Sequence, residues 1–168
     1  MLGRLFPRVI DNDCRGWWLA VWLLAPLVLL KLVMGFNVSG LNPWISNREI
    51  AINADGFALD SYGPEAASVV MFMFASWGVM LLVLSLHGLL VLVRYRAIIP
   101  LMYLLLGIEQ FGRKAIGLAQ PIVSAAAKSD GLSPAFLINT GFMAVLVIGF
   151  ALSLAQRQGA GRQAEALS

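Results

Sequence analysis

Four long stretches of apolar residues alternate with polar segments along the chain. They cover residues 16–36, 66–93, 97–118 and 134–156. A helix needs about 20 apolar residues to cross the hydrocarbon core of a membrane, because each residue adds about 1.5 Å to its length. The first, second and fourth stretches contain at most one charged residue each, whereas the third contains three. The pattern predicts an all-α fold, an integral membrane bundle of four helices.

The polar segments beside these stretches complete the expected organisation. Residues 1–15 form an amphipathic N-terminal segment, residues 37–65 an outer loop, and residues 157–168 a polar cytoplasmic tail. Within the loop, Asp55 and Gly56 separate two short runs of alternating apolar residues, a pattern typical of a β-hairpin. We therefore expect a short hairpin that packs as a cap over one end of the bundle.

The composition supports the same class of protein. Hydrophobic residues make up 60% of the 168 residues and charged residues 12%, and the mean hydropathy is +0.81. Soluble domains have about a quarter of their residues charged, so a soluble enzyme, a disordered chain and a nucleic-acid-binding domain are excluded. The single cysteine, Cys14, excludes a disulfide framework and a cysteine-based zinc site. We also find no nucleophile–base pair, metal-ligand set or phosphate loop, and expect neither catalytic residues nor a metal.

The distribution of positive charge predicts the orientation in the membrane. Cytoplasmic segments of membrane proteins are enriched in Lys and Arg. If both termini are cytoplasmic, the inner segments contain seven basic residues: Arg4, Arg8, Arg15, Arg94, Arg96, Arg157 and Arg162. The contrast is clearest between the short turn that holds Arg94 and Arg96 and the acidic loop 37–65. We therefore expect both termini in the cytoplasm.

Four ionisable residues within the spans are the candidate ligand-binding residues: Lys31, His87, Glu109 and Arg113. Such residues are costly in a membrane and usually face the bundle interior or water. Counted from the cytoplasmic ends, Glu109 lies about 18 Å and Lys31 about 22 Å into their spans, and Arg113 follows one helical turn after Glu109. These three residues are expected at one level, whereas His87 lies only about 10 Å in.

Two interpretations of the group formed by Lys31, Glu109 and Arg113 remain open. In the first, Glu109 pairs with Arg113 and Lys31 in a buried network that stability requires whatever the function. In the second, Glu109 is the titratable centre of a pocket open to the outer face, which holds a quinone or a lipid headgroup or relays a proton. His87 has no second ligand at metal or haem spacing, and a hydrogen bond to Ser85 or to a backbone carbonyl is the favoured interpretation for it.

The layout and several short motifs resemble a known group of proteins. The run VRYRAIIPLM at 93–102, the third-span motif EQFGRK at 109–114 and the ADG turn at 54–56 are similar to stretches in small four-helix bacterial membrane proteins of the DoxX-like group and in their relatives of unknown function. The resemblance covers residues 8–125. It implies a four-helix bundle in a bacterial inner membrane with a quinone-linked redox or redox-accessory role, and it carries over no catalytic residues.

Three functions are therefore expected, in this order. The first is a non-catalytic accessory or assembly subunit that docks onto a larger inner-membrane complex through its lipid-facing helices. The second is a quinone- or lipid-binding redox module that uses Glu109, Arg113 and Lys31. The third is a small transporter, which would need to oligomerise to form a path.

Overall fold

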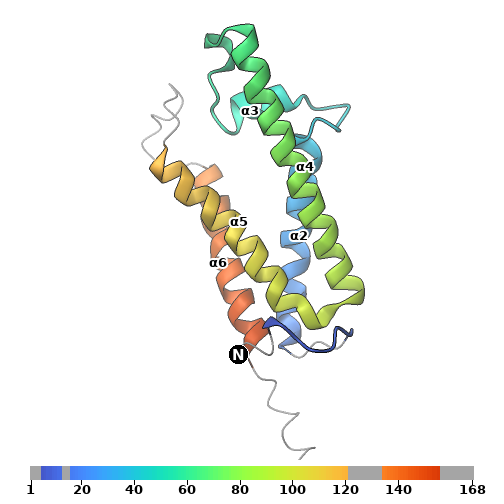
Figure 1. Cartoon of the computed structure of the whole chain (residues 1–168). Coiled ribbons are helices and arrows are strands. Elements are labelled where there is room, and N and C mark those ends of the chain that lie inside the picture. The colour runs from blue at the N-terminus through green and yellow to red at the C-terminus, as the bar shows by residue number, and fades with distance from the viewer. Residues whose placement is uncertain (1–4, 13–15, 121–133, 156–168) are drawn as a thin grey trace, which may run out of the picture.

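The computed structural model describes residues 5–12, 16–120 and 134–155, and this part of the chain is helical with no strand. The four long helices are α2 (Trp18–Val38), α4 (Pro64–Arg94), α5 (Ile99–Ala119) and α6 (Pro134–Leu154) (Figure 1). Three short helices connect them: α3 (Asn47–Asn53), η1 (Leu59–Ser61) and η2 (Arg96–Ile98). The long helices begin and end within a few residues of the four predicted apolar stretches.

Three of these helices are long and apolar enough to cross a membrane. They are α2, α4 and the segment Leu137–Leu154 of α6. The fourth long helix, α5, has the 21 residues that a span requires, but Glu109, Arg113 and Lys114 lower its hydropathy. The predicted all-α class is therefore confirmed, with α5 as the one long helix of mixed character.

Backbone hydrogen bonds between distant segments show how the helices are arranged. The Ala97 N–H donates to the carbonyl of Asp11 at 3.2 Å, and the Trp17 N–H donates to the carbonyl of Leu152 at 3.3 Å. These bonds gather the start of α2, the α4–α5 turn and the end of α6 at one end of the molecule, called here the turn end. The opposite end carries residues 39–63, called here the cap (Figure 1).

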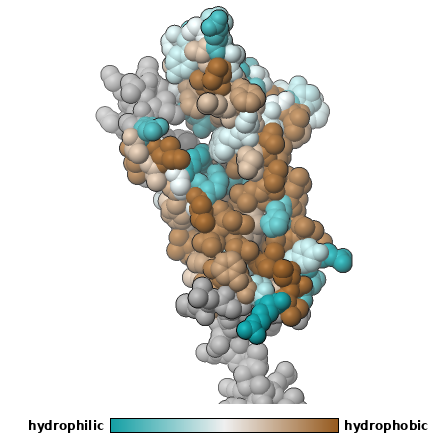
Figure 2. Space-filling view, in the orientation of Figure 1, coloured by the Kyte–Doolittle hydropathy of each residue, from teal (hydrophilic) through white to brown (hydrophobic). Residues whose placement is uncertain are grey.

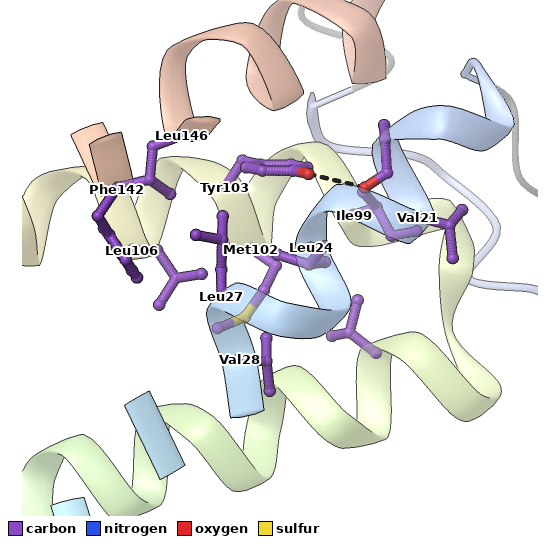
Figure 3. Close-up of a cluster of buried hydrophobic side chains, with 12 residues drawn as sticks. Val21, Leu24, Leu27, Val28, Ile99, Met102, Tyr103, Leu106, Phe142 and Leu146 are labelled. Atoms are coloured by element: carbon purple, nitrogen blue, oxygen red, sulfur yellow. Dashed lines mark hydrogen bonds between the residues drawn. The ribbon is translucent and has the colours of Figure 1, made fainter. Parts of the chain in front are cut away.

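The main hydrophobic core lies between the turn end and the middle of the helices. Its buried residues come from all four long helices: Ala20, Val21, Leu24, Leu27, Val28, Val91, Ile99, Met102, Tyr103, Leu106, Phe142 and Leu146. Tyr103 is 1% exposed, and its hydroxyl donates to the carbonyl of Ala20 at 2.7 Å (Figure 3). This bond satisfies the polar end of a side chain that is otherwise packed among apolar neighbours.

Glycines allow α2 and α4 to approach closely near the cap. A Cβ on Gly78 would lie 2.3 Å from the backbone nitrogen of Ser39, and a Cβ on Gly35 would lie 2.8 Å from that of Leu82. Because backbone atoms cannot swing aside, only glycine fits at Gly78 without moving a helix. Small residues serve the same purpose where helices pack inside membranes.

The predicted hairpin of the cap is wrong. Residues 47–53 form α3, whose first turn is capped by the Ser46 hydroxyl, which accepts from the Arg48 N–H at 3.3 Å. Gly56 has a φ of +73°, and the next N–H, of Phe57, donates back to the carbonyl of Ala51 at 2.9 Å. The Asp55-Gly56 pair therefore follows a short helix and reverses the chain there, as glycine commonly does at helix ends, instead of joining two strands.

Packing against the long helices explains this outcome. The cap contributes Ala51 and Leu59 to a second buried cluster with Val38 of α2 and Phe74 of α4. An isolated two-stranded hairpin is marginally stable, whereas α3 places one apolar face on the helices below it. The cap exists, but it is helical.

The surface of the long helices is strongly hydrophobic (Figure 2). Large apolar side chains that are more than half exposed include Trp22, Leu29, Val33, Phe72, Met73, Met80, Val83, Leu86, Val93 and Ile108. Soluble proteins rarely expose contiguous apolar patches above a few hundred Å². A surface of this kind is suited to contact with lipid tails.

Candidate functional site

The cap end of the helices contains a cluster of polar and charged side chains centred on Lys31. This lysine of α2 is 1% exposed, forms an ion pair with the carboxylate of Glu109 on α5, and donates to Gln110 Oε1 at 2.8 Å. Lys31 Nζ also lies 5.0 Å from the ring centroid of Phe142 on α6, a cation–π contact. The ammonium is thus held from three sides.

Arg113 and Asn139 extend the cluster. Arg113 Nη2 donates to Gln110 Oε1 at 3.3 Å, and Arg113 Nε lies 3.7 Å from Glu109 Oε1. Gln110 Nε2 donates to Asn139 Oδ1 of α6 at 3.2 Å. The guanidinium of Arg113 stacks on Trp77 of α4, with 5.0 Å from Cζ to the ring centroid. Side chains of all four long helices therefore meet here.

A chamber of about 330 Å³ lies between this cluster and the cap. Lys31, Gln110 and Arg113 line it from the helices, and Asp55 lines it from the cap. Burial raises the pKa of the Asp55 carboxyl above its ordinary value of 3.8, and the positive charge of Arg113 partly opposes that shift. The chamber thus has cationic groups on one wall and a carboxyl of weakened acidity on the other.

A second space, here called the groove, runs between α4 and α5 and has a volume of about 600 Å³. Its apolar lining is Phe57, Val70, Met73, Phe74, Trp77, Ile108, Gly112 and Ile116, and its polar lining is Glu109 and Arg113. Figure 2 shows hydrophilic atoms in the hollow between the cap-end parts of these two helices. Arg113 and Trp77 line both spaces, so their stacked pair separates the chamber from the groove.

The three residues predicted to share one level do meet, because α2 and α5 place Lys31 and Glu109 in direct contact. His87 is the exception among the candidate residues. It is exposed on α4, one residue before Gly88, which faces Val28 in the middle of the helices. The Ser85 hydroxyl, suggested as a hydrogen-bond partner of His87, donates to the carbonyl of Leu81 at 2.6 Å.

Among the polar residues of the site, Gln110, Asn139 and Asp55 were not predicted as site residues from the sequence. Gln110 could have been predicted from the sequence, since it is a polar residue next to Glu109 in an expected membrane span. Asn139 has the only side-chain amide among residues 134–155. Because polar side chains in apolar helices commonly form hydrogen bonds to other helices, it too could have been found from the sequence. Nothing in the sequence brings Asp55 to Arg113, because their approach depends on how the cap folds.

Comparison with known proteins leaves the site to be interpreted on its own chemistry. No protein-family model, curated protein or solved structure matches this chain. Among the described residues, no group of three or more His, Cys, Asp or Glu is placed to hold a metal ion. What the cluster offers is a set of fixed charges and hydrogen-bonding groups beside an apolar groove.

Proposed function

We propose that this chain is an integral membrane protein whose four long helices all span a bacterial inner membrane, with both termini in the cytoplasm. The apolar surface and the three long apolar helices support the membrane setting. The polar residues of α5 are compatible with a fourth span because Glu109 and Arg113 turn toward other helices. Arg94 and Arg96 at the turn end favour the cytoplasm for that end.

Within this membrane setting, we propose that the protein binds a small amphipathic molecule, of the quinone or lipid class, in the groove between α4 and α5. One observation carries this proposal: the groove is apolar along its length and has Glu109 and Arg113 as its polar groups. A network needed only for stability would be covered by packed side chains. Here instead a carboxylate and a guanidinium lie beside a space of about 600 Å³, within the range of ligand pockets.

The helix of a partner subunit is the second candidate occupant, which corresponds to an accessory or assembly role. The row of exposed apolar residues on α4, which includes Phe72, Met73 and Met80, supports it, since such a surface fits another transmembrane helix. A transporter is less well supported. Apart from Arg94, the last residue of α4, the charged residues of the described long helices lie toward the cap end, whereas a transport path requires polar groups through both halves of the membrane.

The proposal is tested by native mass spectrometry of the protein extracted from its own membrane in mild detergent. We expect an adduct of a few hundred daltons on the wild-type protein and on Gly117→Leu, and its loss in Gly112→Leu. A Cβ on either glycine meets no described atom within 4 Å, so we expect both variants to fold, but of the two glycines only Gly112 lines the groove.

Other outcomes of this experiment are equally informative. Larger subunits that co-purify at fixed stoichiometry, and are lost in Gly112→Leu, would establish the partner helix as the occupant. A bare protomer in all three samples would contradict both candidates.

A further inference from the structure

Among the fully buried side-chain oxygen and nitrogen atoms of the described residues, one atom of the charged cluster has no hydrogen-bond partner. Lys31 Nζ donates to both the Glu109 carboxylate and Gln110 Oε1. Gln110 Oε1 also accepts from Arg113, and Gln110 Nε2 donates to Asn139. Glu109 Oε1 is buried and accepts no hydrogen bond from any described residue. Its neighbour Arg113 Nε, at 3.7 Å, is beyond hydrogen-bond distance.

This open acceptor belongs to the residue that lines the groove. Glu109 is 18% exposed and is one of two polar residues in a lining that is otherwise apolar. A buried carboxylate oxygen without a donor costs free energy. The atom has almost no exposed surface, so a donor in the groove reaches it once the Glu109 carboxyl turns toward the groove.

The charges around Glu109 narrow the choice of donor. Lys31 and Arg113 place two positive charges beside one negative charge, so a ligand ammonium would meet net repulsion. A ligand carbonyl, ether or phosphate oxygen can accept from Arg113, which also lines the groove, but it leaves the Glu109 oxygen without a donor. A neutral hydroxyl avoids both penalties, and the apolar lining requires the rest of the molecule to be apolar.

We propose that the groove binds a membrane-soluble molecule through a neutral hydroxyl group that donates a hydrogen bond to Glu109 Oε1, with its apolar body between α4 and α5. This inference rests on the proposed ligand-binding function and specifies its chemistry. Alcohols and phenols share the required group, and a quinone in its oxidised form lacks it.

Competition between matched probes tests the proposal. The wild-type protein in detergent is offered a phenol with a para-dodecyl chain and the methyl ether of that phenol, and bound masses are compared by native mass spectrometry. The ether keeps the apolar body but cannot donate. Because hydrogen bonds to charged groups are stronger than neutral ones, we expect a preference of about tenfold for the phenol. Equal binding of the two probes would overturn the proposal.

Two further experiments identify the kind of hydroxyl that binds and the residue that accepts its hydrogen bond. A cyclohexanol with the same chain, compared with its own ether, separates aliphatic from phenolic hydroxyls. In Glu109→Gln, Lys31 takes the amide oxygen and the amide N–H faces the groove, so the preference for the phenol is expected to disappear. A retained tenfold preference in Glu109→Gln would contradict the assignment to this residue.

Failure of this inference is distinguishable from failure of the proposed function. If both probes bind equally and Gly112→Leu excludes both, the groove is a binding site but the hydroxyl does not determine recognition. If neither probe binds and the extracted protein carries no adduct, the proposed function itself fails. The wild-type comparison stands even if Glu109→Gln does not accumulate.

Discussion

A lysine that is 1% exposed inside an apolar helix requires a fixed counter-charge, and Lys31 has one in Glu109. Removing one partner of a buried pair costs about 3–5 kcal/mol, and without Lys31 the Glu109 carboxylate keeps only the more distant Arg113, at 3.7 Å. We expect Lys31→Met to lower the free energy of unfolding by about this amount, measured by denaturant titration in micelles. Lys114→Met, on an exposed residue of α5, is the matched control.

The double variant Lys31→Met with Glu109→Gln separates pairing from packing. The double variant removes both charges, so no carboxylate is left beside the methionine at position 31. We therefore expect it to be more stable than the sum of the two single losses would give. Additive losses in the double variant would mean that the two side chains do not interact energetically.

Burial of the Asp55 carboxyl makes stability depend on pH at the cap. Burial raises its pKa in the folded state, so the folded protein binds this proton more tightly than the unfolded chain does. Its contribution is therefore complete below the ordinary pKa and is lost as the pH rises through the raised pKa. In Asp55→Asn, the free energy of unfolding should fall less over this range than in the wild-type protein.

The control for Asp55 is Glu65→Gln, since Glu65 is exposed at the start of α4. This variant should keep the pH dependence of the wild-type protein, followed by thermal unfolding at a series of pH values. An unchanged slope in Asp55→Asn would show that the carboxyl is not buried in the chamber.

At the scale of helices, the contact between α2 and α4 depends on Gly78. A Cβ there would lie 2.3 Å from the Ser39 nitrogen and 2.7 Å from the Ser39 Cα. We expect Gly78→Ala to cost about 1–3 kcal/mol, as overpacking usually does, in spite of the better helix propensity of alanine. Gly141→Ala on α6, whose Cβ meets no described atom within 4 Å, should be neutral or slightly stabilising.

The long helices could be predicted from sequence because an apolar run of 20 residues has few alternatives. The cap could not, because the Asp55-Gly56 signal fits both a hairpin turn and the turn after a short helix, and contacts with Val38 and Phe74 decide between them. That Lys31 and Glu109 lie at the same depth along their helices could be predicted from the rise per residue of a helix alone. The groove could not, since it depends on how far α4 and α5 diverge.

At the scale of the molecule, the orientation in the membrane can be tested by labelling. In a background with Cys14→Ser, a membrane-impermeant maleimide added to intact spheroplasts should label Ser61→Cys in the cap. It should label Arg94→Cys at the turn end only after permeabilisation. If only Arg94→Cys were labelled in intact spheroplasts, the protein would have the opposite orientation, with its cap in the cytoplasm.

The most direct measurement of ligand binding in the groove is photocrosslinking in the membrane. A hydroxyl-bearing amphiphile with a diazirine on its alkyl chain is added to membranes, irradiated, and mapped by peptide mass spectrometry. We expect crosslinks at Met73, Ile108 and Ile116, which line the groove, and their loss in Gly112→Leu. Crosslinks spread equally over Leu29 and Val33, which are exposed on α2, and unchanged in Gly112→Leu, would contradict a binding site between α4 and α5.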